Sequence, residues 1–164
     1  MNSYDEKQYE SHAYSLTYPE HLQAMGRLFG LNPAPYSKAR ILELGCASGG
    51  NILPMAANFP EASFVGIDLS ETQILAGQNI QKELGLKNIT LKHQSILDFD
   101  LKSGPYDYIL CHGVYSWVPE EVRQHILEIC HKTLAPEGIA CISYNTLPCW
   151  NMVTCVRDMM LFHV

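Results

Sequence analysis

Short apolar runs alternate with amphipathic segments along most of this 164-residue chain, and each kind of segment predicts a different element. The apolar runs have the length and aliphatic content of buried strands, and they lie at 39–44, 64–67, 88–93, 106–112 and 139–144. The segments 51–58, 70–84 and 119–134 place apolar side chains at helical spacing. This alternation predicts an α/β fold with a doubly wound, mostly parallel sheet.

A further helix is predicted before the first strand. Thr17 and Glu20 have the spacing of a capping box, and Gly30 marks a helix stop. Between these signals, apolar residues recur on one helical face that we expect to pack on the sheet: Leu22, Met25, Leu28 and Phe29. Ser70 and Gln73 form a second capping box, which predicts the start of the helix after the second strand.

The first predicted strand passes directly into a loop of small residues, Gly45-Cys46-Ala47-Ser48-Gly49. Glycine adopts left-handed backbone conformations and has no Cβ, so such a loop brings bare main chain close to a ligand. Asp68 ends the second strand, 23 residues after Gly45. One βαβ unit delivers an acid to a pair of ribose hydroxyls at this spacing. The two features together predict half of a nucleotide-binding site.

The acidic residue Glu43 separates two classes of nucleotide site. Gly45, Ala47 and Gly50 satisfy the permissive glycine pattern of nicotinamide-dinucleotide domains, which is a weak signal by itself. A carboxylate at the end of the first strand would lie where the pyrophosphate of a dinucleotide binds. The apolar neighbours of Glu43 indicate a buried strand, and a buried acid needs a partner. A ligand with a positive charge is therefore favoured over a dinucleotide.

Several candidate binding residues map to the same edge of the predicted sheet. Ligands of parallel sheets bind at the carboxyl ends of the strands, near the point where the strand order reverses. The residues at such ends are Glu43 to Gly49, Asp68, Ser95-Ile96 and Cys111-His112. Their convergence predicts one site.

Composition excludes several kinds of partner. The formal net charge is −6 and Lys and Arg form no cluster, which argues against nucleic acid and against an anionic membrane surface. No apolar run approaches the roughly 18 residues of a membrane span. The first six residues are polar and acidic, so we expect a cytoplasmic protein. Most of the six cysteines lie inside apolar patterns, which indicates reduced, buried thiols. The spacing of Cys149 and Cys155 does not match common zinc sites, so no metal is expected.

Three motifs resemble those of a known family. They are Leu44 to Asn51 (LGCASGGN), His112 to Pro119 (HGVYSWVP), and Ser143 to Thr146 (SYNT) followed by Arg157 to Met160 (RDMM). With an acid two residues before the first glycine, the chain resembles the class I S-adenosylmethionine-dependent methyltransferases. Within that superfamily it resembles bacterial enzymes with a C-terminal methyltransferase regulatory domain, a group that includes rickettsial protein-lysine methyltransferases. The resemblance runs over nearly the whole chain.

The resemblance implies a Rossmann-like methyltransferase core and S-adenosylmethionine as the cofactor. It also implies which residues bind that cofactor: Glu43, Gly45, Cys46, Ala47, Gly49, Asn51, Asp68, Leu69, Ser95, Ile96, Cys111 and His112.

Methyl transfer from a sulfonium requires few catalytic side chains, because the donor is already activated. His112 is a candidate base, with a main-chain hydrogen bond as its alternative role. Tyr115, Trp117 and Tyr144 are candidates for the walls of an acceptor channel, with core packing as the alternative. The Asn-Pro-Pro-Tyr type of motif is absent, so a protein acceptor such as lysine, or a small molecule, is favoured. The N-terminal tyrosines are candidates for a lid: Tyr9, Tyr14 and Tyr18.

The chain lacks the last two strands of this family's sheet. About 20 residues follow Tyr144, and they predict a helix. We therefore expect three segments: 1–38 with the covering helix, 39–146 as the methyltransferase core, and 147–164 as the start of a helical insertion. The fifth strand is apolar along its length, so we expect it to be buried on both faces. An uncovered edge there predicts a truncated chain, with self-association or a partner chain covering the edge.

A non-catalytic remnant that binds S-adenosylmethionine is the alternative function. The family pattern after Asn145 is usually Tyr-Pro-Gly-Trp-His, whereas this chain has Leu147-Pro148-Cys149-Trp150-Asn151. This departure affects the acceptor side more than cofactor binding.

Overall fold

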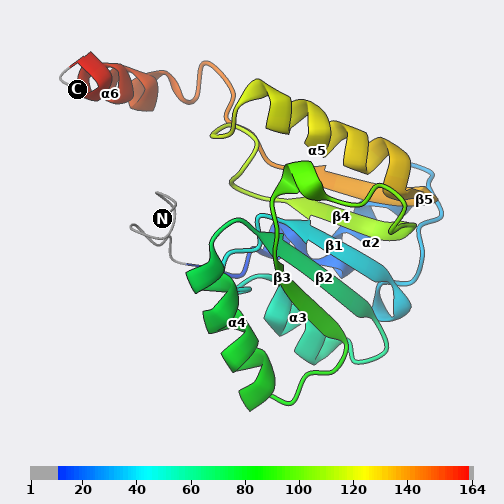
Figure 1. Ribbon diagram of the computed structural model, residues 1–164. Helices are drawn as coiled ribbons and strands as arrows, with labels where there is room; N and C mark the ends of the chain where they lie inside the picture. Colours follow the sequence, from blue (N-terminus) through cyan, green and yellow to red (C-terminus); the bar gives the residue numbers. More distant parts are fainter. Residues whose placement is uncertain (1–10, 163–164) are drawn as a thin grey trace.

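The computed structural model describes residues 11–162 of the chain (Figure 1). One sheet holds strands in the order β3-β2-β1-β4-β5, and every neighbouring pair is parallel. The strands are β1 Arg40–Leu44, β2 Ser63–Asp68, β3 Ile89–His93, β4 Tyr106–Cys111 and β5 Leu134–Ile142. The predicted α/β class and the parallel sheet are confirmed, and within residues 11–162 the sheet has no sixth strand.

Helices cover both faces of this sheet (Figure 1). Helices α2 Pro19–Leu28, α3 Ile52–Asn58 and α4 Glu71–Glu83 supply side chains to one buried cluster, and α5 Glu120–Thr133 packs on the opposite face. Short 3-10 turns, η1 Ser15–Thr17, η2 Tyr36–Lys38 and η3 Ile96–Asp98, lie between these elements. Helix α6, Asn151–Phe162, lies apart from the layers. None of the helices in the described part is long and apolar enough to cross a membrane.

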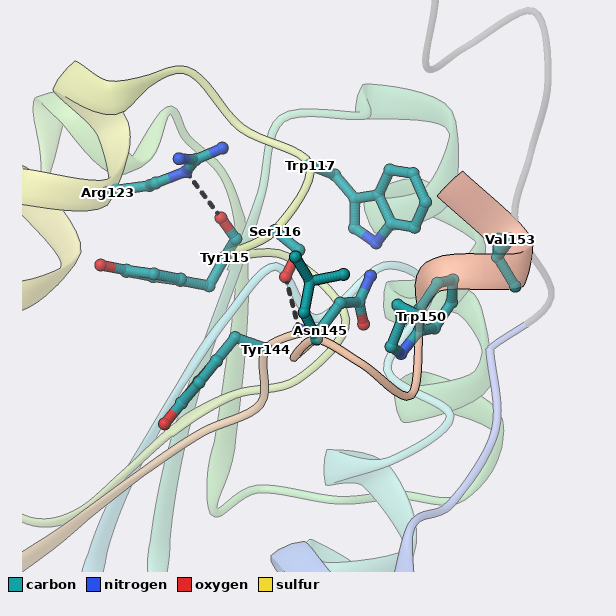
Figure 2. A pocket seen from close by; sticks show the side chains of 9 residues that line it. Tyr115, Ser116, Trp117, Arg123, Tyr144, Asn145, Trp150 and Val153 are labelled. Atoms are coloured by element: carbon teal, nitrogen blue, oxygen red, sulfur yellow. Dashed lines mark hydrogen bonds between the residues drawn. The ribbon is translucent and has the colours of Figure 1, made fainter. Parts of the chain in front are cut away.

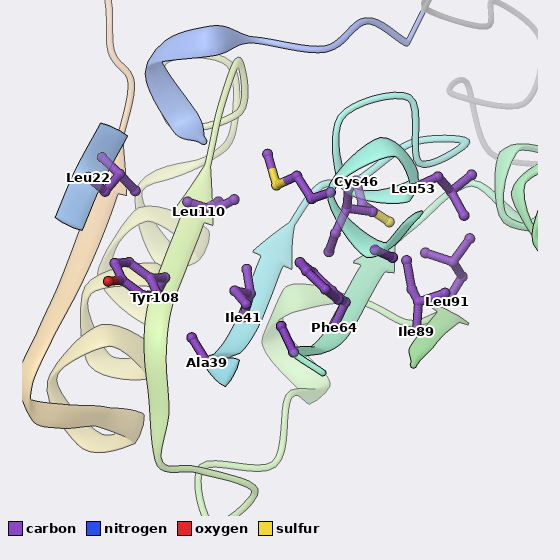
Figure 3. Packing of buried hydrophobic residues seen from close by; sticks show 14 of the residues in the cluster. Leu22, Ala39, Ile41, Cys46, Leu53, Phe64, Ile89, Leu91, Tyr108 and Leu110 are labelled. Carbon is purple, nitrogen blue, oxygen red and sulfur yellow. The ribbon is translucent and has the colours of Figure 1, made fainter. Parts of the chain in front are cut away.

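The two core clusters follow from the period of two along each strand. On β1, Ile41 belongs to the cluster under α2, α3 and α4, whereas Leu42 and Leu44 belong to the cluster under α5. Figure 3 shows the first cluster, where Phe64 and Ile41 lie on neighbouring strands. This alternation places Glu43 on the same face as Ile41, beneath the start of α3.

The strand order reverses beside β1, which pairs with β2 on one side and with β4 on the other. In open parallel sheets, a crevice forms at the carboxyl ends of the strands at such a point. The loops after β1 and β4 leave the sheet in opposite directions, toward α3 and α5 respectively. The candidate site therefore lies at the ends of β1, β2 and β4.

Two predictions about α2 are wrong. Its N-cap is Tyr18 rather than Thr17, because the Thr17 hydroxyl donates instead to the Tyr14 carbonyl and to the Asn51 side chain. The apolar face is not buried as expected: Leu28 and Phe29 are 75% and 77% exposed, and Met25 is also exposed. The helix touches the sheet through Leu22 and Gly26 because it crosses the edge strand β5, where Ile139 lies against Gly26.

The expectation that β5 is buried on both faces is also wrong. None of its nine residues is fully buried, and Pro136, Glu137 and Ala140 are exposed. The reason is position: within the described residues β5 forms the edge of the sheet and pairs with β4 alone.

The start of α4 agrees with the sequence. Ser70 is the N-cap, and its hydroxyl accepts a hydrogen bond from the main-chain N–H of Gln73 at 3.3 Å. Gly77, in the middle of this helix, is buried against the loop that follows β1. A Cβ at Gly77 would lie 2.6 Å from the Ser48 carbonyl oxygen and 2.8 Å from Leu91. The absence of a side chain at Gly77 therefore lets α4 support the glycine loop.

Gly77→Ala should lower the free energy of unfolding by about 1–3 kcal/mol, although alanine is the better helix former, because main chain of the loop blocks the added methyl group. Chemical denaturation would measure the change. Asn79→Ala is the matched control on the exposed side of α4, where helix propensity predicts a gain of a few tenths of a kcal/mol. A stabilised Gly77→Ala protein would contradict the packing argument.

Candidate functional site

The loop after β1 is tied to the end of β2 by its own main chain. The N–H groups of Gly45 and Cys46 both donate to the Ile67 carbonyl oxygen, at 2.9 and 3.0 Å. Gly45 and Gly49 have φ values of 76° and 82°, which glycine adopts without strain. Ala47 also lies in the left-handed region, with φ 49°, where a Cβ is unfavourable. The loop thus presents bare main chain at the switch point, as the sequence predicts.

Asp68 at the end of β2 holds this loop and the next helix together. Its Oδ2 accepts from the Ala47 N–H at 2.8 Å, and its Oδ1 accepts from the Ser70 N–H at 2.8 Å. The hydrogen bond from the Ala47 N–H offsets the unfavourable left-handed backbone conformation of Ala47. A carboxylate has about four acceptor positions, so Asp68 retains capacity for hydroxyl donors of a ligand.

Glu43 is the buried charge of the site. Its side chain is 3% exposed, and its Oε1 accepts from Asn51 Nδ2 at 2.7 Å. Its Oε2 is buried with no hydrogen-bond partner among the described residues. Burial raises the pKa of Glu43 to about 7, although the Asn51 hydrogen bond lowers it in part and the nearby Asp68 raises it further. An unpartnered buried carboxylate oxygen is a site for a cationic group of a ligand.

An N-terminal segment, residues 11–17, lies across the glycine loop. Asn51 Oδ1 accepts from the Tyr14 N–H at 3.0 Å and from the Thr17 hydroxyl at 3.1 Å. The Gly50 N–H donates to Ser11 Oγ at 2.8 Å. We did not predict these contacts, because the partners lie 34 to 39 residues apart in sequence.

The tyrosines that were predicted to form a lid do not act as one group in the structure. The Tyr14 ring lies over His112, with ring centroids 3.8 Å apart. Tyr18 instead packs against Phe59 next to the first core cluster, and Tyr9 lies outside the described residues.

The other residues expected to bind a cofactor surround the same edge with different exposure. Leu69 is 43% exposed after β2, and its carbonyl is 3.0 Å from His93 Nε2. Ser95 caps η3 through a bond from the Leu97 N–H, and Ile96 packs beside the second core cluster. The Cys111 side chain is fully buried in that cluster, so its main chain alone could reach a ligand.

A cavity lies beyond the ends of β4 and β5, with a volume of about 350 Å³ (Figure 2). The predicted residues Tyr115 and Tyr144 meet there, with ring centroids 6.3 Å apart, and Trp117 meets Trp150 at 6.2 Å with perpendicular rings. The lining consists of Tyr115, Ser116, Trp117, Arg123, Tyr144, Asn145, Leu147, Trp150 and Val153. Arg123 was not singled out from the sequence, where no spacing relates it to the aromatic residues. Asn145 and Trp150 lie in segments that the sequence analysis compared with the family, but it did not predict that they line a channel.

His112 is not part of this lining and lies between the two regions, at the end of β4 under Tyr14. Partial burial lowers the pKa of its imidazole. A neutral imidazole is therefore favoured at neutral pH, and such a ring can accept a proton.

Known proteins are similar to this chain in sequence over nearly its whole length. A model of the methyltransferase domain family matches residues 41–138. The chain is 53% identical over 162 residues to the uncharacterized protein RP789 of Rickettsia prowazekii, covering 99% of this chain and 29% of that protein. It is 52% identical over 161 residues to RP028 of the same organism, covering 98% of this chain and 64% of that protein.

A solved structure is similar over almost the entire chain. PKMT2 from Rickettsia typhi, in complex with AdoHcy, has 48% sequence identity and a TM-score of 0.89, and the match covers 94% of this chain and 30% of PKMT2. The chain therefore spans less than two thirds of the length of each of these three relatives.

The raised pKa of Glu43 predicts a specific dependence of stability on pH. The folded protein holds this proton up to about pH 7, whereas the unfolded chain releases it near the ordinary glutamate pKa of 4.5. The unfolded state therefore binds fewer protons in this window, so the free energy of unfolding falls as pH rises through it. Between pH 5 and pH 8, the wild type should lose roughly 2 kcal/mol more than Glu43→Gln, which has no charge to bury.

Urea denaturation at a series of pH values would measure this difference. Glu61→Gln is the control, because Glu61 is exposed and paired with Lys38, and this variant should follow the wild-type curve. Parallel pH curves for the wild type and Glu43→Gln would show that Glu43 is not protonated in the folded protein at pH 5.

Proposed function

The chain belongs to the class I S-adenosylmethionine-dependent methyltransferases, and from this membership we propose that it transfers a methyl group from that cofactor to the amino group of a protein lysine. The single observation that supports cofactor binding most strongly is the buried Oε2 of Glu43, which has no hydrogen-bond partner among the residues that the structure describes. A small molecule is the alternative acceptor.

The residues at the ends of β1 and β2 fit S-adenosylmethionine. The cofactor carries an ammonium group and a ribose diol, and it supplies a methyl group already activated on a sulfonium. Glu43 Oε2 would hold the ammonium, which satisfies the buried oxygen and favours its charged form. Asp68 would accept from the ribose hydroxyls with the acceptor positions that its two main-chain bonds leave free. The AdoHcy that PKMT2 binds in its structure supports the same assignment.

The proposed acceptor site consists of His112 and the aromatic cavity. An amine attacks only when it is neutral, so a lysine acceptor must first lose a proton. His112, with its lowered pKa, is the proposed group that takes this proton. Tyr115, Trp117 and Tyr144 would guide the alkyl chain toward it, since the aromatic faces attract both methylene groups and a cation. Among the described residues, the cavity lining contains no acid that would hold the amine in its charged form.

We propose the segment boundaries 1–38, 39–146 and 147–164 as functional units. The open edge of β5 and the exposed Leu28 and Phe29 beside it are proposed to be covered by a second copy or a partner chain.

Asp68→Ala should weaken binding of S-adenosylhomocysteine, the demethylated product, by about 1.5–3 kcal/mol, because ribose hydroxyls lose a charged acceptor. Isothermal titration calorimetry would measure the affinity. Ser70→Ala is the matched control: it removes the N-cap of α4 but leaves the carboxylate, and should change the affinity little. Equal affinities of the wild type and Asp68→Ala, or tight binding of a nicotinamide dinucleotide by the wild type, would count against this cofactor assignment.

Trp117→Ala should lower kcat/KM for lysine-containing acceptor peptides by about tenfold or more while leaving the affinity for S-adenosylhomocysteine within about twofold, because Trp117 lines the aromatic cavity. Transfer of a labelled methyl group would be assayed. Leu84→Ala, which removes an exposed apolar side chain at the end of α4, is the control and should leave both quantities unchanged. If Trp117→Ala methylates peptides as fast as the wild type, the aromatic cavity is not the acceptor site.

A further inference from the structure

The segment Ser11 to Thr17, here called the N-terminal strap, is attached to the glycine loop at both of its ends. Ser11 Oγ accepts from the Gly50 N–H at one end, and the Thr17 hydroxyl donates to Asn51 at the other. Gly50 leaves room for this contact, since a Cβ there would lie 2.6 Å from the Ser11 carbonyl carbon. The strap therefore follows the outer surface of the loop and brings Tyr14 over His112.

Asn51 connects the strap to Glu43. Its amide is 4% exposed, with Oδ1 accepting from the strap at Tyr14 and Thr17 and Nδ2 donating to Glu43. Both ends of the amide are thus engaged by protein groups, which differs from the direct cofactor contact implied by the family resemblance. An amide cannot rotate about its terminal bond without losing all three hydrogen bonds, so Asn51 fixes the strap and the carboxylate together.

The two oxygens of Glu43 have different tasks as a consequence. Oε1 is occupied by Asn51, so Oε2 is the oxygen left for a ligand cation. A cation at Oε2 stabilises the charged carboxylate, and a hydrogen bond to a charged acceptor is stronger than one to a neutral acid. Ligand binding at Oε2 would thus strengthen the Asn51 bond at Oε1 and hold Asn51 more firmly in the orientation that the strap requires.

We propose that Asn51 is a positioning residue that couples the N-terminal strap to Glu43, so that an ammonium-bearing cofactor closes the strap and release of the cofactor requires the strap to detach. This inference rests on the proposed binding of S-adenosylmethionine. It adds a control of cofactor exchange by a segment far from the glycine loop in sequence.

Hydrogen exchange of the full chain, read by mass spectrometry over peptides that cover residues 11–17, would test the coupling. S-adenosylhomocysteine should slow exchange of the strap amides, the Tyr14 N–H included, by about tenfold or more. 5′-Methylthioadenosine, which has the adenosine end but no ammonium, should bind without this protection. Equal protection by the two ligands, or no protection by a bound S-adenosylhomocysteine, would overturn the proposal.

Variants on the strap side avoid disturbing Glu43 directly. Thr17→Val keeps the shape of a buried side chain but removes the hydroxyl that donates to Asn51 and to the Tyr14 carbonyl, and it should raise the dissociation rate of S-adenosylhomocysteine about five- to tenfold. Asn51→Ala should have a larger effect and abolish the ligand-induced protection of the strap. Asn58→Ala, an exposed amide at the end of the same helix α3, is the control and should leave the dissociation rate and the protection unchanged.

Different outcomes would refute the proposed function and the coupling. A wild-type chain that binds no S-adenosylhomocysteine would refute the proposed function and the coupling with it. A wild type that binds this ligand while Thr17→Val releases it at the wild-type rate would refute the coupling alone.

Discussion

The hydrogen bond between Asn51 and the buried carboxylate of Glu43 is the contact on which the site depends. Burial of Glu43 is unfavourable by itself, since it removes a carboxylate from water and raises its pKa to about 7. Asn51 offsets part of this cost at one oxygen and leaves the other unsatisfied. A fold that keeps an unsatisfied acid in its core is poised for a ligand that supplies a positive charge, which is the electrostatic property that S-adenosylmethionine offers.

The sheet makes this arrangement possible because it fixes the ends of separate strands at one edge. Strand β1 delivers Glu43 and β2 delivers Asp68, and the strand order reverses beside β1, where ligands of open parallel sheets bind. The period of two puts Glu43 on the face of α3, so Asn51 at the start of that helix reaches it directly. The same register turns Cys111 toward α5 and into the second cluster, which explains why a residue at a strand end does not contribute its side chain.

Local patterns predicted the parts of the structure that local forces determine. The apolar runs located β1 to β4 to within about one residue, whereas β5 begins at Leu134, five residues before the predicted run. Ser70 forms the predicted cap because its partner, the Gln73 N–H, is three residues away. Thr17 has the same sequence signal but its hydroxyl bonds to Asn51, a partner 34 residues away that no short pattern reveals. The apolar side chains of α2 predicted the helix correctly but not which of its faces is buried, because the buried face depends on where the helix crosses β5. The aromatic cavity likewise joins Tyr115 to Trp150 through the fold alone.

Different kinds of contact hold the glycine loop and the strap in place. This difference indicates by which route a ligand reaches the site. The loop is held by two main-chain bonds to Ile67, by Asp68 at Ala47, and by the close approach of Gly77 to Ser48. Displacing it would disturb β2, α4 and the core between them. The strap is held to the loop at Asn51 and Gly50 by hydrogen bonds whose groups water can satisfy once the segment lifts away. Its detachment costs less than any movement of the loop, so a ligand that reaches Glu43 is expected to enter and leave past the strap rather than through the loop.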